Sequence, residues 1–112
     1  MITEGVHFAL PPGITREELL AKYRQTAPAW ASNDDLVQKL YCFDAEKSLG
    51  GGVYIWKSRD AARRWHGDEY KARIRALYDC EVRMDFYDTL VIVDNVGHEI
   101  RLPTESGPAS ST

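Results

Sequence analysis

The stretch that decides the fold is GGGVYIWKSRDAARRW, which occupies residues 50–65. Its first part, Gly51 to Trp56, predicts a β-strand that carries apolar side chains on both faces. Ser58 predicts the start of a helix, because its hydroxyl can accept a hydrogen bond from a free N–H group of the first turn. Apolar residues then recur at helical spacing from Ala61 to Leu77, and Gly67 leaves open whether this helix is continuous or broken.

Elements of alternating type flank this strand and helix. Three more strands are predicted, over Thr3–Leu10, Leu36–Phe43 and Val82–Asp94. A short hairpin or edge segment is expected at residues 99–102. A helix is predicted to begin at Thr15, which forms a capping-box pattern with Glu18, and to kink or end near Ala27, because Pro28 has no N–H. The order β-α-β-β-α-β predicts an α+β, ferredoxin-like fold, in which two helices cover one face of a four-stranded antiparallel sheet.

The predicted sheet has more apolar surface than its own helices cover. Two strands, Leu36–Phe43 and Gly51–Trp56, are apolar on both faces, whereas the helices cover only one. A second copy of the chain, packed sheet against sheet, is the simplest cover for the other face, so we predict a homodimer. The length of 112 residues suits one domain. We place it at residues 1–102, followed by a disordered tail at 103–112, whose sequence PTESGPASST is almost free of apolar residues.

Composition excludes several classes of protein. The chain carries 14 basic and 17 acidic residues, for a net charge of −3, whereas a nucleic-acid-binding domain is usually basic. No run of about 18 apolar residues is present, so no membrane span is expected. The first residues, MITEGVHF, do not have the pattern of a signal peptide. Cys42 and Cys80 are too few for a disulfide framework, and we expect reduced thiols in a cytoplasmic protein.

The same block, residues 50–65, also resembles the signature of small dimeric α/β-barrel proteins, which include the antibiotic-biosynthesis monooxygenases and the YdhR-type mono-oxygenases. The motifs ITREELLAKY (14–23) and VIVDN (91–95) extend the resemblance over roughly residues 5 to 95. It implies a pocket between sheet and helices for hydrophobic, often polycyclic, molecules. Some members oxidise such molecules with O2 without flavin or metal, so we expect no cofactor. Other members are cyclases or isomerases, and many have no known reaction.

His66 and Tyr70 are the candidate catalytic residues. Four residues apart on a continuous helix, they would share the face that meets the sheet. A histidine there can move a proton near neutral pH, and Tyr70 can hydrogen-bond a phenolic or enolate oxygen. The alternative is that His66 is a half-exposed residue at the edge of the core and that Tyr70 fills volume. A break at Gly67 would separate the pair and favour this alternative.

Aromatic residues of the two helices are candidates for the pocket wall. Trp65, Trp30 and Tyr23 are expected at the interface between helices and sheet, where they could stack on a flat ligand or simply form core. The strand residues Tyr41, Tyr54 and Trp56 line either the pocket or the dimer interface, because the facing of their strands is open.

Two polar residues complete the predicted substrate-binding set. His7 lies in the first strand, where Val6, Phe8 and Leu10 alternate with polar Glu4 and His7, and it could face inward. Arg73 could hold a carboxylate or enolate. The three histidines do not have the spacing of metal ligands and no pair of cysteines stands near them, so no metal site is expected.

The sequence thus predicts a cofactor-independent monooxygenase that acts on a hydrophobic aromatic or polyketide-like small molecule. In this mechanism His66 removes a proton from a phenol or enol, and the carbanion reacts with O2 in an apolar pocket. One alternative keeps the pocket and the proton transfer without oxygen, as in a cyclase or isomerase. The other is a dimer that binds a small molecule without catalysis, because no self-sufficient catalytic motif stands in the sequence.

Overall fold

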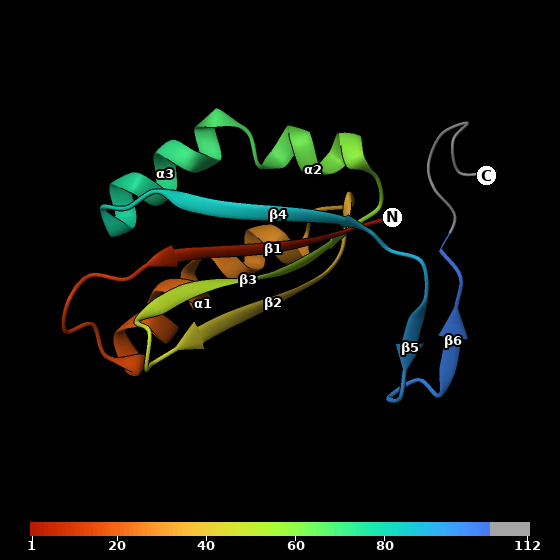
Figure 1. The fold of residues 1–112 in the computed structure, drawn as a ribbon, viewed down its shortest axis with the longest axis horizontal. Coiled ribbons are helices and arrows are strands. Elements are labelled where there is room, and N and C mark those ends of the chain that lie inside the picture. The colour runs from red at the N-terminus through yellow and green to blue at the C-terminus, as the bar shows by residue number, and fades with distance from the viewer. Residues whose placement is uncertain (104–112) are drawn as a thin grey trace.

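The computed structural model describes residues 1–103 and has the predicted α+β, ferredoxin-like arrangement (Figure 1). Four strands form an antiparallel sheet in the order β2-β3-β1-β4. They are β1 (Ile2–Ala9), β2 (Leu36–Asp44), β3 (Leu49–Trp56) and β4 (Val82–Asp88). The helices are α1 (Arg16–Ala31), α2 (Arg59–Trp65) and α3 (Asp68–Tyr78). The predicted disordered tail lies outside the described residues, except for Pro103.

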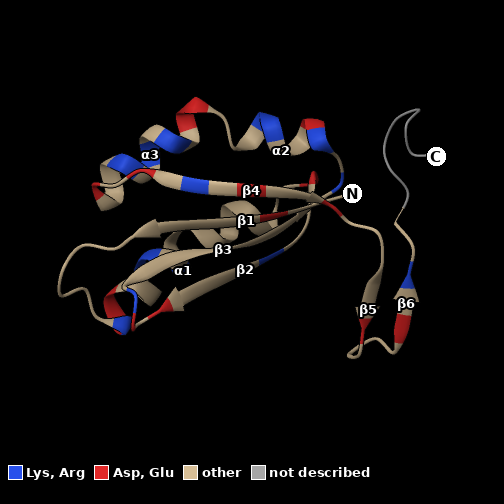
Figure 2. Ribbon diagram, in the orientation of Figure 1, with Lys and Arg blue, Asp and Glu red and all other residues tan. Residues whose placement is uncertain are grey.

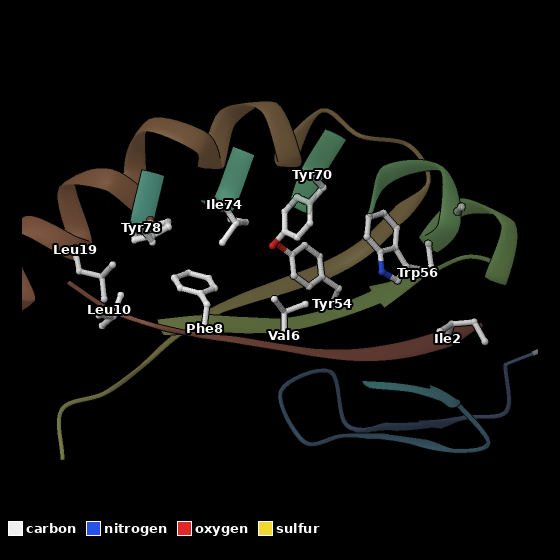
Figure 3. Close-up of a cluster of buried hydrophobic side chains, with 12 residues drawn as sticks. Ile2, Val6, Phe8, Leu10, Leu19, Tyr54, Trp56, Tyr70, Ile74 and Tyr78 are labelled. Carbon is white, nitrogen blue, oxygen red and sulfur yellow. The ribbon is translucent and has the colours of Figure 1, made fainter. Parts of the chain in front are cut away.

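One face of the sheet forms the core with the helices. Along β1 the residues alternate, so that Ile2, Glu4, Val6 and Phe8 are buried and the residues between them are less so. The register between β1 and β3 sets Glu4 opposite Tyr54, and both side chains belong to the helix-facing side. Figure 3 shows the apolar side chains of this face directed towards the helices.

The helices begin where their caps predict, but their ends differ from the prediction. The Thr15 hydroxyl accepts from the Glu18 N–H and the Glu18 carboxylate accepts from the Thr15 N–H, so the capping box is confirmed. Of the two alternatives predicted near Ala27, a kink or an end of the helix, the end is wrong, because α1 continues through Pro28 to Ala31. Proline removes one intrahelical hydrogen bond, and the packing of Trp30 against the core on the following turn outweighs that loss.

The second predicted helix is broken at His66 and Gly67. The Ser58 hydroxyl accepts from the Ala61 N–H and starts α2 as predicted. His66 ends α2, and Gly67, in an extended conformation, precedes the first residue of α3. The N-terminus of α3 therefore receives no side-chain cap.

Glycines let the strands and α1 approach one another closely at the start of β3. A Cβ atom on Gly51 would lie 1.9 Å from the Val6 carbonyl oxygen, and the φ of +141° is one that other residues rarely adopt. At Gly50 the Cβ would lie 2.8 Å from the Tyr23 hydroxyl. These close approaches allow Tyr23 to sit directly on the sheet.

The long final strand predicted for Val82–Asp94 is divided in the structure. The ladder between β1 and β4 runs to Ile2 and Asp88, and one more hydrogen bond, from the Thr89 N–H to the Met1 carbonyl at 3.1 Å, follows it before the strand ends. The chain instead forms a separate two-stranded hairpin, β5 (Ile92–Asp94) with β6 (Glu99–Arg101). The hairpin projects beyond the end of the main sheet (Figure 1).

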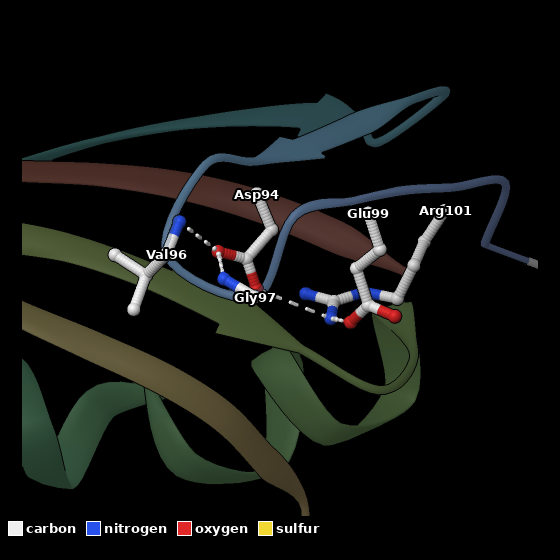
Figure 4. Close-up of polar contacts among 5 residues, drawn as sticks. All are labelled: Asp94, Val96, Gly97, Glu99 and Arg101. Atoms are coloured by element: carbon white, nitrogen blue, oxygen red, sulfur yellow. Dashed lines mark hydrogen bonds and ion pairs between the residues drawn. The ribbon is translucent and has the colours of Figure 1, made fainter.

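Hydrogen bonds to one carboxylate close the hairpin turn (Figure 4). Oδ1 of Asp94 accepts from the N–H groups of Val96, at 3.0 Å, and Gly97, at 2.9 Å. The hydrogen bond from Gly97 is the largest cause that lowers the pKa of Asp94, and the bond from Val96 adds to it. The turn is therefore well defined, although the exposed aliphatic side chains around it have little to pack against.

Charges of both signs alternate along α2 and α3 (Figure 2). Arg59 pairs with Asp88 at 3.0 Å, and Arg75 pairs with Glu81. This is the pattern of a solvated helix face. Within residues 1–103, no helix is both long and apolar enough to cross a membrane.

Candidate functional site

A cavity of about 580 Å³ lies between the helices and the helix-facing side of the sheet. Aromatic side chains from α1, β2, β3, α2 and α3 line it: Tyr23, Trp30, Tyr41, Tyr54, Trp65 and Tyr70. The structure thus brings together most of the predicted site, including Arg73. It also settles the facing of Tyr41 and Tyr54, which belong to the cavity. A cavity of this size and lining suits a small, flat, apolar ligand.

Tyr23 is fixed at the floor of the cavity by its hydroxyl. The hydroxyl donates to the Cys42 carbonyl at 2.9 Å and accepts from the Gly51 N–H at 2.9 Å. The Tyr23 ring also packs on Tyr41, with 4.6 Å between ring centres. Burial raises the pKa of Tyr23, so its phenol stays neutral and keeps both hydrogen bonds.

Trp30 is the centre of the aromatic cluster. Its ring makes edge-on contacts with Tyr54, Trp56 and Trp65, with ring centres 5.4, 5.9 and 6.5 Å apart. Trp65 is 42% exposed, and its indole N–H donates to the Asp35 carboxylate at 2.9 Å. Trp65 therefore stands at the mouth of the cavity, where an entering ligand would meet it.

A buried polar cluster, formed by Glu4, Trp56 and His66, lies behind the aromatic residues that line the cavity. Glu4 Oε1 accepts from the Trp56 indole N–H at 2.8 Å and lies 2.6 Å from His66 Nδ1. The side chains of Glu4 and His66 are both fully buried. Glu4 Oε2 and His66 Nε2 have no hydrogen-bond partner among the described residues.

The protonation state of His66 follows from this burial. Desolvation lowers the pKa of His66, although the hydrogen bond to Glu4 opposes the shift. A neutral imidazole at this distance donates its Nδ1 proton to the carboxylate, which leaves Nε2 as an unprotonated acceptor. This tautomer is assigned from the hydrogen-bond partners.

Tyr70 joins this cluster to the cavity. Its ring stacks on that of His66, with 3.9 Å between centres and 21° between planes, and its hydroxyl lies 3.3 Å from that of Tyr54. The helix break at Gly67 therefore does not separate the pair, contrary to the sequence-based expectation. Burial raises the pKa of Tyr70 to about 12, so it remains a neutral hydrogen-bond donor.

Two predicted residues do not reach the cavity. His66 is absent from its lining, whereas the rings of Tyr54 and Tyr70 that contact His66 belong to it. His7 pairs with Gly51 and belongs to the opposite face of the sheet, so the sheet itself separates it from the cavity. Trp56, whose facing was open, contributes to the buried cluster behind the wall.

Glu4 and Lys39 are polar residues of this region that sequence reasoning missed. The alternation along the strand could have identified Glu4, because residues two apart point to the same face. Glu4 therefore shares the face of Val6 and Phe8 and not that of His7. Lys39 gave no such signal, since it stands in an apolar strand whose facing was open. Among residues 1–103, no group of three metal-ligating side chains is close enough to hold a metal ion.

The fold and the cavity define a ferredoxin-like α+β protein with an aromatic-lined cavity between its helices and its sheet. The family model described as "putative mono-oxygenase ydhR" matches residues 5–96, and the chain belongs to this family. This confirms the resemblance that residues 50–65 carry. No curated protein matches the chain.

Solved structures that share the fold include two oxygenase-type proteins. A "putative antibiotic biosynthesis monooxygenase" from Deinococcus radiodurans is 16% identical, with a TM-score of 0.57 over 80% of this chain and 92% of that one. A variant of SnoaB, a cofactor-independent oxygenase from Streptomyces nogalater, is 15% identical, with a TM-score of 0.58 over 79% of this chain and 91% of that one. At this identity, the likeness establishes the architecture.

Proposed function

We propose that this chain is a cofactor-independent monooxygenase of a flat, hydrophobic small molecule that carries an acidic phenol or enol. The observation that carries the proposal is the aromatic cavity of about 580 Å³ in a chain of a mono-oxygenase family. The oxygenase activity named for SnoaB, which has the same fold, supports the choice of a reaction without cofactor.

The proposed reaction balances without an added reductant. A substrate with an acidic methylene group loses a proton, and its carbanion gives electrons to O2 to form a hydroperoxide. Loss of water from this hydroperoxide leaves a carbonyl, so that one methylene group and one O2 molecule yield one carbonyl group and one water molecule. One oxygen atom enters the product, and the other leaves as water. An apolar cavity favours this route because it excludes the water that would reprotonate the carbanion.

Tyr70 has the clearest role in this scheme. Its neutral hydroxyl lines the cavity and can donate a hydrogen bond to the enolate oxygen as charge develops there. His66 stacks on Tyr70 from the buried side, so it acts as a positioning residue for that ring. Trp30, Trp65 and Tyr23 would hold the planar rings of the substrate.

Oxygen uptake with anthrone tests the function. Wild-type protein should consume O2 and form anthraquinone, with one atom of 18O from labelled O2 in each product. Tyr70→Phe should lower kcat/KM by about 10- to 100-fold, since one hydrogen bond to the developing anion is lost. Lys47→Met, in the exposed turn between β2 and β3, is the control and should keep the wild-type rate.

The outcome also separates the alternatives. Product that forms equally well without oxygen would identify a cyclase or isomerase and end the oxygenase proposal. Binding of aromatic molecules with no turnover of anthrone or quinol substrates would instead support a non-catalytic binding protein.

We also propose that the chain forms a homodimer through the uncovered face of the sheet. Leu40, which is 48% exposed, and Tyr87, which is 60% exposed, lie on this face with Val53 and Ile55 between them. Apolar residues grouped on an open sheet face support an interface with a second copy.

A further inference from the structure

A lysine stands in the aromatic cavity without a polar partner. The register of β2 against β3 sets Lys39 opposite Tyr54, on the helix-facing side, and Lys39 lines the cavity. Its Nζ atom lies 3.9 Å from the ring centre of Tyr41, 4.4 Å from that of Tyr54 and 4.6 Å from that of Trp30. No hydrogen bond or ion pair within residues 1–103 reaches this nitrogen.

A second cation lines the same cavity. The guanidinium carbon of Arg73 on α3 lies 5.6 Å from the ring centre of Tyr70. The buried carboxylate of Glu4 accepts from its two hydrogen-bonding neighbours through Oε1, and its charge attracts Lys39. Asp35, at the mouth, is bound by Arg64 and Trp65. Two basic side chains, Lys39 and Arg73, therefore line one cavity, and an anion bound between them would relieve their repulsion.

The state of the amine suits proton transfer. Burial is the largest cause that lowers the pKa of Lys39 to about 7, and repulsion from Arg73 is the second. The charge of Glu4 opposes the shift. The neutral form of the amine is therefore accessible near neutral pH. A lysine that is desolvated beside another cation is a recognised form of activated amine, and a base with a pKa near the working pH is the most effective.

We propose that Lys39 accepts a proton from the ligand bound in the cavity. Once protonated, it is the counter-ion of the oxyanion that the ligand has become. Its neutral amine takes the proton from the hydroxyl of a bound phenol or enol, and the resulting ammonium holds the oxyanion. The O–H bond breaks, an N–H bond forms, and the electron pair stays on the substrate oxygen. The inference rests on the proposed function for the class of ligand, but it concerns proton transfer and not the reaction with O2.

Several other titratable or charged groups line the same cavity or interact with Lys39 electrostatically, and their charges are part of the expected pH dependence. They come from β1, β2, β3, the α helices and the loop before β2: Glu4, Tyr41, Tyr54, Tyr23, His66, Tyr70, Arg73, Asp34 and Asp35. Burial raises the pKa of the four tyrosines and lowers that of His66. Lys39 is therefore the cavity base that we expect to titrate near pH 7.

The first test uses 4-nitrophenol, whose own pKa lies near neutrality and whose anion is yellow. At pH 6 we expect saturating wild-type protein to bind the probe as the yellow phenolate, with quenching of tryptophan fluorescence. Lys39→Met should bind it at least tenfold more weakly and without the colour change. Lys47→Met, which removes a lysine from the exposed turn between β2 and β3, should behave as wild type.

A second variant separates proton transfer from simple charge. Arginine keeps the positive charge but stays protonated, so Lys39→Arg should still bind yellow phenolate. With anthrone, wild-type kcat/KM should rise about tenfold per pH unit up to about pH 7 and then level off, because the base must be neutral. The kcat/KM of Lys39→Arg should be at least tenfold lower than that of the wild type, and it should no longer rise with pH.

Two results would overturn the inference. One is a probe that stays neutral in the wild-type complex, a measurement that does not depend on how well any variant folds. The other is oxygen uptake by Lys39→Arg with the wild-type rate and pH profile. Yellow complex without any oxygen uptake would leave Lys39 as the counter-ion of the bound oxyanion and refute the oxygenase function, so the two proposals fail in different ways.

Discussion

At the scale of single residues, the contact between Glu4 and His66 ties the stability of the core to pH. Both side chains are fully buried, and the carboxylate also accepts from Trp56. Removing one partner from such a cluster leaves the others desolvated and unpaired, which costs about 3–5 kcal/mol for a charged group. The cluster is therefore a structural requirement for placing Tyr70 against the cavity, whatever the reaction.

The buried His66 should make the protein less stable in mild acid. Its pKa in the folded state lies below the ordinary value of about 6.5 that the unfolded chain has. As the pH falls below about 6.5, the unfolded chain takes up a proton that the folded one does not. The free energy of unfolding should therefore fall, by up to about 1.4 kcal/mol per pH unit. Urea unfolding at pH 7.5, 6.5 and 5.5, at one protein concentration, measures this slope.

Two variants isolate the contribution of this histidine. His66→Gln keeps an amide donor for Glu4 but cannot titrate, so its stability should vary less over this pH range. His98→Asn removes the exposed histidine of the β5–β6 turn, and asparagine tolerates the φ of 55° found there. That variant should keep the wild-type slope. Equal slopes for wild type and His66→Gln would contradict the assignment.

At the scale of elements, α1 is longer than its sequence favours. Pro28 is exposed and stands inside the helix, where it removes a hydrogen bond and crowds the preceding turn. We expect Pro28→Ala to raise the free energy of unfolding by about 1–3 kcal/mol, since an interior proline costs about 3 kcal/mol relative to alanine. Thermal unfolding checks this expectation. Pro12→Ala, in the loop before α1, is the control and should change the stability little; a lower melting temperature for Pro28→Ala would show that the proline suits the helix.

The sequence predicted most of the elements because local signals mark their boundaries. The Thr15 and Ser58 caps and the two-faced strands are local features, and each is found where it was expected. The continuation past Pro28 and the division of the last strand were not predicted, because tertiary contacts decide both. Trp30 packs on the core from the last turn of α1, and β4 ends where its ladder with β1 ends, at Asp88.

The candidate site was predictable in its aromatic part and not in its polar part. Helical spacing placed Tyr23, Trp30 and Tyr70 towards the sheet, and these residues line the cavity. The facing of β2 could not be decided from a strand that is apolar on both sides, so Lys39 was missed. Burial of His66 depends on Glu4, a partner more than 60 positions away in the chain, and no periodicity reveals such a pair.

At the scale of the whole molecule, two apolar surfaces are without cover among the described residues 1–103. One is the open face of the sheet, around Leu40 and Val53. The other is the β5–β6 hairpin, where Val93 is 64% exposed and Ile100 is 71% exposed. A two-stranded hairpin of this length is only marginally stable by itself. A second copy that covers the sheet face would explain why so much aliphatic surface is maintained on this side of the molecule.

Light scattering after size-exclusion chromatography tests the dimer. We expect the wild-type chain of 12.7 kDa to elute with twice that mass. Leu40→Glu should shift it towards the monomer, because a carboxylate on each copy would be buried and repelled at the two-fold contact. Leu20→Glu, on an exposed position of α1 that is 51% accessible, adds the same charge away from the sheet face and should remain dimeric. A wild-type monomer, or a Leu40→Glu dimer as stable as the control, would show that the sheet face is not the interface.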